Sequence, residues 1–269
     1  MLIVIKGAGD LASGVALRLK HAGFDIVMTE LAEPLAVRRS VSFSQAVYDG
    51  TAQVEDVAAV LVQDEQQMAE ALARSQIAVF VDPAAEIAST LRKIAQPPLA
   101  VVDAIMAKKN TGTAIDDAPL VIGMGPGFTA GIDCHAVVET MRGHTLGRVI
   151  TAGSAAPNTG IPGEVGGYTS ERLLRCCAAG IFAPATEIGS TVKKGSTVAL
   201  IQTAAAAVPV CAAIDGIVRG LLPSGIRVTQ GMKAGDIDPR CDRSCCFTVS
   251  DKALAIGGGV LEALLRFAP

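Results

Sequence analysis

Two glycine-rich segments contain residue types that could bind a phosphate group. In the first, residues 7–12 have the spacing G-x-G-x-x-A and follow a short apolar run at residues 2–6. This order predicts a strand, a tight turn permitted by Gly7, and a helix with free N–H groups beside Gly9; the alternative is a turn kept for packing alone. A second apolar run ends at Glu30, where dinucleotide-binding folds place an acid for a ribose hydroxyl. The candidate binding residues here are Gly7, Gly9, Asp10, Ala12 and Glu30.

The second segment, residues 123–131, has four glycines in nine residues and follows an apolar run at residues 120–122. Such a loop leaves main-chain N–H groups uncovered, which suits a phosphate or an oxyanion. We expect a helix from Asp133 to Arg142 behind it. The segment is not a P-loop, because the Gly-Lys-Ser/Thr ending is missing. The candidate binding residues are Gly125, Gly127, Phe128 and Thr129.

Two short basic segments could add positive charge to such a site. Arg38 and Arg39 could hold a phosphate, since guanidinium groups match phosphate oxygens in a bidentate way. A solvated basic pair is the other interpretation. Lys108, Lys109 and Asn110 form a donor-rich loop typical of anion sites, although a plain surface turn fits the same residues.

The cysteines offer a second kind of chemistry. Cys134 falls at the start of the expected helix, where the helix dipole would lower its pKa and favour a nucleophile or soft-metal ligand. A buried packing cysteine is the competing interpretation. Near the end of the chain, Cys241, Cys245 and Cys246 could hold a metal, selenium or sulfur. Their spacing matches no standard zinc site and no His lies nearby, so we predict no metal site.

The elements that would position these residues alternate in type along the first part of the chain. Short apolar runs at residues 25–29, 54–62, 77–81 and 99–102 are separated by helical patterns. Strands alternating with helices predict a Rossmann-like, doubly wound parallel sheet of the α/β class. Ligands of such sheets lie beyond the carboxyl ends of the strands. We expect residues 1–160 to form this nucleotide-binding domain.

The later part of the chain has an internal repeat with a period of 36 residues. The positions that recur are Gly180, Gly189, Val192 and Gly195, matched by Gly216, Gly225, Val228 and Gly231. Two copies of a short-strand unit predict a β barrel-sandwich hybrid like those of biotinyl and lipoyl domains over residues 161–250. No Lys occurs from residue 196 to residue 232, so a carrier role is excluded. Residues 251–269 are expected to form a C-terminal helix that packs back on the first domain.

Composition narrows the class of protein. The chain has 269 residues, a formal net charge of −3 and only 3% aromatic residues, so it lacks a basic surface or stacking residues for nucleic acid. Its apolar runs are far shorter than a membrane span needs, and no membrane partner is expected. Seven cysteines in a chain of this length favour reduced thiols and a cytoplasmic location.

Several long motifs together resemble the YqeB family. They lie at residues 7–14, 38–43, 102–110, 123–131, 235–240 and 255–259. The resemblance implies an accessory protein of a selenium-dependent molybdenum hydroxylase system, and it implies no catalytic residue.

Three functions therefore remain open. The first is an accessory or maturation protein that binds a nucleotide or phosphate-bearing cofactor at the glycine loops, with NAD(P) or a molybdenum cofactor dinucleotide as the suspected ligand. The second is an NAD(P)-dependent oxidoreductase, and the third is a non-catalytic protein that docks a molybdenum hydroxylase subunit. Whether the protein is an enzyme and whether it forms a homo-oligomer are not decided by the sequence.

Overall fold

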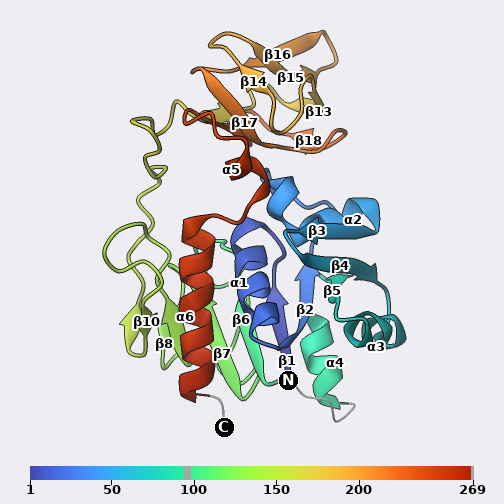
Figure 1. The fold of residues 1–269 in the computed structure, drawn as a ribbon, viewed down its shortest axis with the longest axis vertical. Helices are drawn as coiled ribbons and strands as arrows, with labels where there is room; N and C mark the ends of the chain where they lie inside the picture. The colour runs from blue at the N-terminus through green and yellow to red at the C-terminus, as the bar shows by residue number, and fades with distance from the viewer. Residues whose placement is uncertain (94–97, 268–269) are drawn as a thin grey trace. The chain divides into compact units, whose positions relative to one another are not determined.

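The computed structural model describes residues 1–93 and 98–267 (Figure 1). The chain divides into two compact units. The first unit consists of Met1–Pro34, Ser42–Thr159 and Val249–Pro269, and the second of Leu35–Val41 and Gly160–Thr248. The second unit thus takes a seven-residue segment from the early part of the chain, which the sequence did not predict.

The first unit is built on a nine-stranded sheet with the order β10-β9-β7-β6-β1-β2-β5-β4-β3. The central strands are apolar and fully buried, as Ile3, Val4 and Ile5 of β1 illustrate, because a strand inside such a sheet is covered on both faces. The nine strands are β1 (Leu2–Lys6), β2 (Asp25–Glu30), β3 (Thr51–Val54), β4 (Val57–Val62), β5 (Ile77–Val81), β6 (Ala100–Asp103), β7 (Leu120–Met124), β9 (Ala136–Val138) and β10 (Val149–Ile150).

Helices cover this sheet, and the longest comes from the end of the chain. The helices of the first unit are α1 (Asp10–His21), α2 (Ala46–Asp49), α3 (Glu65–Ala73), α4 (Glu86–Lys93) and α6 (Asp251–Phe267), with a 3₁₀ turn at Phe43–Gln45. A two-stranded sheet joins β8 (Thr129–Ala130) to β11 (Gly153–Ser154). Among the described residues, no helix is long and apolar enough to cross a membrane.

The predicted doubly wound parallel sheet of Rossmann type is wrong, because the sheet is mixed. β3 pairs with β4, and β9 with β10, in the antiparallel sense. The strand expected at residues 54–62 is confirmed for β4, residues 57–62, whereas Val54 ends β3 and the chain turns at Glu55, whose φ is +52°. The expected helix from Asp133 to Arg142 is also wrong, because the apolar residues 136–138 form buried strand β9 beside β7. Within the described part of the chain, neither β6–β7 nor β7–β9 is connected by a helix.

The second unit contains two four-stranded antiparallel sheets, with the orders β12-β19-β17-β14 and β16-β15-β13-β18. Its helical parts are α5 (Ser244–Phe247) and a 3₁₀ turn at Arg39–Val41. The strands are β12 (Leu173–Arg175), β13 (Gly180–Pro184), β14 (Thr191–Val192), β15 (Thr197–Gln202), β16 (Ala207–Cys211), β17 (Gly216–Leu221), β18 (Arg227–Val228) and β19 (Lys233–Asp238).

The 36-residue period appears in these strands. β13, β14 and β15 begin 36 residues before β17, β18 and β19, and β13 pairs with β18 as β17 pairs with β14. The same period relates β12 to β16, which pair with β19 and β15. The predicted biotinyl- and lipoyl-like module is nevertheless wrong, because the unit is not built from the two copies alone. Val37 of the early segment is buried in its core, where its carbonyl accepts from the Leu221 amide.

Helices α1 and α6 pack side by side and parallel, through glycines (Figure 1). A Cβ at Gly14 would lie 2.5 Å from the Cβ of Ala253, and one at Gly257 would lie 3.0 Å from the Cβ of Arg18. On another side of α6, Gly259 rests on the carbonyl oxygen of Gly147. The run of three glycines therefore stays in one continuous helix and permits close approach by the main chain.

The Gly259 contact yields a prediction with a control next to it in the sequence. Gly259→Ala should lower the free energy of unfolding by about 1–3 kcal/mol, because its Cβ would overlap a main-chain oxygen in a packed interior. At Gly258 a Cβ meets nothing within 4 Å, so Gly258→Ala should raise the stability by up to about 1 kcal/mol through helix propensity. Urea unfolding of both variants measures this. Equal effects of the two changes would contradict the packing described here.

Candidate functional site

The turn between β1 and α1 lies at the carboxyl edge of the nine-stranded sheet. Gly7 has a φ of +94°, and its amide donates to the Thr29 carbonyl at 2.8 Å, which fixes the turn against β2. Gly9 is the N-cap of α1, with φ −71° and ψ −175°, and no side chain caps the helix there. The first turn of a twelve-residue helix therefore begins without a capping side chain, as an anion site requires.

Glu30 holds this turn in place. One carboxylate oxygen accepts from the Ala8 amide at 2.9 Å and the other from the Leu31 amide at 2.8 Å. The acid expected to bind a ribose hydroxyl thus ties the turn to the end of β2. The Ala8 amide of the turn is therefore already hydrogen-bonded within the protein.

A buried polar network, which sequence reasoning missed, lies beside the turn. The Lys6 ammonium donates to Thr113 Oγ1 at 3.0 Å and to the Asp117 carboxylate at 2.9 Å. Thr113 in turn donates to Asp103 Oδ2 at 2.6 Å. Lys6, Asp103 and Thr113 are each at most 8% exposed, so these bonds satisfy groups that would be costly to bury alone. The only signal in the sequence was that Lys6 and Asp103 each end an apolar strand.

This network fastens residues 104–113 across the edge of the sheet. Two residues of the loop, Met106 and Lys108, have left-handed backbones with φ of +62° and +64°. Lys108 and Lys109 are exposed. Asn110 is engaged within the loop, because its Oδ1 accepts from the Thr113 amide at 2.8 Å and its Nδ2 donates to the Thr113 carbonyl. The loop therefore presents two lysines, while its asparagine serves to shape it.

The second glycine segment is filled largely by the protein's own atoms. A Cβ at Gly127 would lie 2.6 Å from the Lys109 Cα, so this glycine allows residues 104–113 to pack closely. The Gly125 amide donates to the Val138 carbonyl at 2.9 Å. Phe128 is buried, and a Cβ at Gly123 would overlap its ring. These glycines are explained by packing, which was not among the roles we predicted.

Thr129 lies at the outer end of the same segment. Its hydroxyl is 3.0 Å from the Ser154 hydroxyl, and its amide donates to Asp133 at 2.7 Å. Ala12, by contrast, is buried within α1. The structure thus places Gly127 against Lys109, and Asp133 accepts from both Thr129 and Asn110 of the loop of residues 104–113.

A half-buried lysine near the end of the chain, Lys252, also lies at the carboxyl edge of the sheet. Lys252 lies in the first turn of α6, and burial, followed by the charge of Arg142, lowers its pKa from the ordinary 10.5. Asp10, in the first turn of α1, and Glu139, after β9, act in the opposite direction. Arg142 is itself held by Asp251 through two bonds of 2.7 and 2.8 Å. Sequence reasoning did not single out Lys252, because only the packing of α6 on α1 brings it to this edge.

Arg38 and Arg39 belong to the second unit, where both guanidinium groups bind main-chain carbonyls. Arg38 donates to Cys245 and Thr248 at 3.0 and 3.1 Å, and Arg39 donates to Leu221 at 2.9 Å. These bonds fix the early segment within the second unit. They give both arginines a structural role there.

Two of the candidate cysteines, Cys134 and Cys246, are buried. Cys134 is fully buried in the loop before β9, and burial raises its pKa to about 11, opposite to the lowering expected from a helix start. Cys246 is buried too, and burial raises the pKa of its thiol. No group of three or more His, Cys, Asp or Glu residues in the described ranges could hold a metal ion.

Comparison with known proteins identifies the family. No protein-family model matches the chain. The chain is 50% identical over 264 residues to the Uncharacterized protein YqeB of Escherichia coli (strain K12), an alignment that covers 98% of this chain and 47% of that protein. The chain therefore belongs to the YqeB family, which confirms the resemblance found in the motifs. It spans about half the length of this curated relative.

Solved structures give only distant likenesses. An aspartoacylase family protein from Mesorhizobium loti is 14% identical with a TM-score of 0.30, and the alignment covers 88% of this chain and 84% of that one. A succinylglutamate desuccinylase/aspartoacylase from Rhodobacter sphaeroides is 11% identical with a TM-score of 0.29, over 87% and 86% of the two chains. At such scores the likeness supports no conclusion about function.

Thiol labelling tests the burial of Cys134. Iodoacetamide at pH 8 should alkylate the exposed Cys177, Cys211 and Cys241 of the native protein and leave Cys134 unmodified until it unfolds. The reason is that the thiolate is the reacting form, and a pKa of about 11 in a buried site makes it scarce. Peptide mass spectrometry reads the result. Modification of native Cys134 as fast as Cys241 would refute the assigned environment.

Proposed function

We propose that the first unit binds a phosphate-bearing small molecule, such as a nucleotide or a dinucleotide cofactor, at the turn between β1 and α1. The observation that carries the proposal is the start of α1 at Gly9, where no side chain caps the helix. Free N–H groups and the positive end of the helix dipole favour an anion at that position. Gly9 has no side chain of its own to cover the main chain there.

Neighbouring groups support the same ligand chemistry. Lys252 shares the carboxyl edge with Asp10 in the first turn of α1, and burial disfavours its ammonium form, so a bound anion would stabilise that form. Lys108 and Lys109 are exposed on the loop that packs against Gly7, through Ala104 and Ile105, and against Gly127. A ligand phosphate at the α1 start would meet charge from at least one of these lysines.

The biological setting of this binding rests on the family. An accessory or maturation role in a selenium-dependent molybdenum hydroxylase system is what the YqeB resemblance implies, and a molybdenum cofactor dinucleotide is a phosphate-bearing molecule of the proposed class. We propose this role for the chain on that ground. A direct test is whether the purified protein binds to a molybdenum hydroxylase subunit or alters its cofactor content.

A charge placed at Gly9 tests the binding site. Gly9→Asp should keep the fold, because Asp is a good N-cap, but should weaken binding of ADP or pyrophosphate at least tenfold by repulsion. Gly9→Asn is the matched control, since it caps equally well without charge and should weaken binding less. Isothermal titration calorimetry with pyrophosphate, ADP, CTP and NAD gives the affinities. Equal affinity of wild type and Gly9→Asp, or no binding of any probe at millimolar concentration, would rule out this site.

The pH dependence of binding tests Lys252. The ammonium exists below its lowered pKa, so affinity for pyrophosphate should be highest there and fall as pH rises through a value below 10.5. Lys252→Arg should remove this fall, because Arg stays charged, whereas Lys252→Gln should bind about five- to tenfold more weakly at neutral pH. The same decline with pH in all three proteins would exclude Lys252 as the group responsible.

A further inference from the structure

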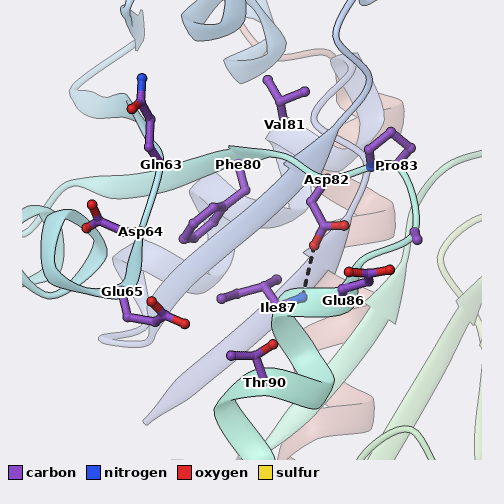
Figure 2. Close-up of a pocket in the computed structure, with 11 residues that line it drawn as sticks. Gln63, Asp64, Glu65, Phe80, Val81, Asp82, Pro83, Glu86, Ile87 and Thr90 are labelled. Atoms are coloured by element: carbon purple, nitrogen blue, oxygen red, sulfur yellow. Dashed lines mark hydrogen bonds between the residues drawn. The ribbon is translucent and has the colours of Figure 1, made fainter.

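A groove of about 550 Å³ lies at the carboxyl ends of β4 and β5, separate from the residues proposed to bind phosphate (Figure 2). All of its lining belongs to the first unit. The loops that lead into α3 and α4 form its two walls. The lining residues are Gln63, Asp64, Glu65, Phe80, Val81, Asp82, Pro83, Ala84, Glu86, Ile87 and Thr90.

The floor of the groove is apolar. Figure 2 shows Phe80 and Ile87 in its middle, and each is less than 10% exposed. Val81, the last residue of β5, is 44% exposed, which is unusual for a large aliphatic side chain at the end of a central strand. The groove therefore offers apolar surface to whatever enters it.

The rim of the groove is acidic on both sides. Asp64 and Glu65 stand on the α3 side, and Asp82 and Glu86 on the α4 side (Figure 2). No Lys, Arg or His is among the residues that line it in the described part of the chain. Four carboxylates around an apolar floor are complementary to a side chain that is aliphatic along its length and positive at its tip.

Two of these acids are held in place by the main chain. Asp64 Oδ1 accepts from the Gln67 amide at 2.8 Å, and Asp82 Oδ2 accepts from the Ile87 amide at 2.9 Å. Each uses one carboxylate oxygen as a helix cap and keeps the other available for a ligand. Glu65 and Glu86 follow in the first turns and are exposed. The negative charge is thus positioned before any partner arrives, which reduces the entropy lost on binding.

We infer that this groove binds a basic segment of a partner protein, with a Lys or Arg stem on Phe80 and Ile87 and its charge between the acids. Most of the rim residues are exposed, so the groove is open to solvent. Sites for small molecules are more enclosed and bury roughly 70–90% of the ligand's surface. A side chain presented by a larger partner fits an open groove better than a free small cation does. This inference concerns a different ligand and different residues from the phosphate site, so either can fail alone.

Peptide binding to the whole chain tests the inference. A fluorescently labelled octapeptide of alternating Arg and Leu should bind, and Glu65→Gln with Glu86→Gln should raise its Kd about three- to tenfold, since each exposed ion pair contributes modestly. The matched control is Glu70→Gln with Glu262→Gln, which removes the same charge from exposed positions outside the groove and should leave the Kd unchanged. Fluorescence anisotropy gives the Kd values.

The outcomes separate specific docking from general attraction. Shifts of the Val81 and Ile87 methyl NMR signals with the basic peptide, and none with an octapeptide of Glu and Leu, would support the groove. Equal Kd values for the two double variants, binding of the acidic peptide as tight as that of the basic one, or no binding at millimolar concentration would overturn the inference. An anionic vesicle carries the same charge as this rim and should not bind to it. If the wild-type chain bound such vesicles and the double variant Glu65→Gln with Glu86→Gln did not, the inference would also be overturned.

Discussion

The close contact between α1 and α6 is the constraint on which the first unit depends. It joins residues about 240 positions apart in the sequence. Residues 160–248 of the second unit lie between the two helices in the chain. Two parallel helices can approach this closely only where side chains are absent, which is why glycines stand at Gly14 and Gly257. The same contact brings Lys252 beside Asp10, so the charge at the candidate site is a consequence of helix packing.

The carboxyl edge of the sheet has to satisfy many buried polar groups at once. Lys6, Asp103 and Thr113 form one continuous network, and Glu30 binds two main-chain amides of its own edge. Burying such groups without partners would cost several kcal/mol in total, at about 1–3 kcal/mol each. The polar groups of the edge are therefore largely paired, whereas the start of α1 has no capping side chain.

Two surfaces of opposite charge character share this edge. The turn at Gly9 offers N–H groups and nearby lysines, whereas the groove between α3 and α4 offers carboxylates over Phe80 and Ile87. A protein that binds a phosphate-bearing cofactor and hands it to another protein needs both a cofactor site and a docking surface. The proposed function and the inferred groove are consistent with that arrangement while resting on separate residues.

The sequence by itself determined the local features of this protein. Apolar runs located most strands, the G-x-G spacing located the turn at Gly7 and the start of α1, and the long motifs identified the family. The 36-residue period anticipated the strands of the second unit, because each copy repeats the same pattern of turns and buried positions. These features depend on residues close together in the chain.

Only the tertiary structure decided which neighbours those residues meet. Residues 136–138 form a strand because they pair with β7 in the sheet. The antiparallel sense of the outer strand β10 is likewise set by its pairing with β9. The spacing of the glycines at 123, 125 and 127 predicted an anion-binding loop. In the structure these glycines lie against Phe128, Thr140 and Lys109, respectively. Cys134 gains a raised pKa from burial that its position in the sequence did not reveal. Burial and long-range contact set these outcomes, and neither is encoded in the spacing of adjacent residues.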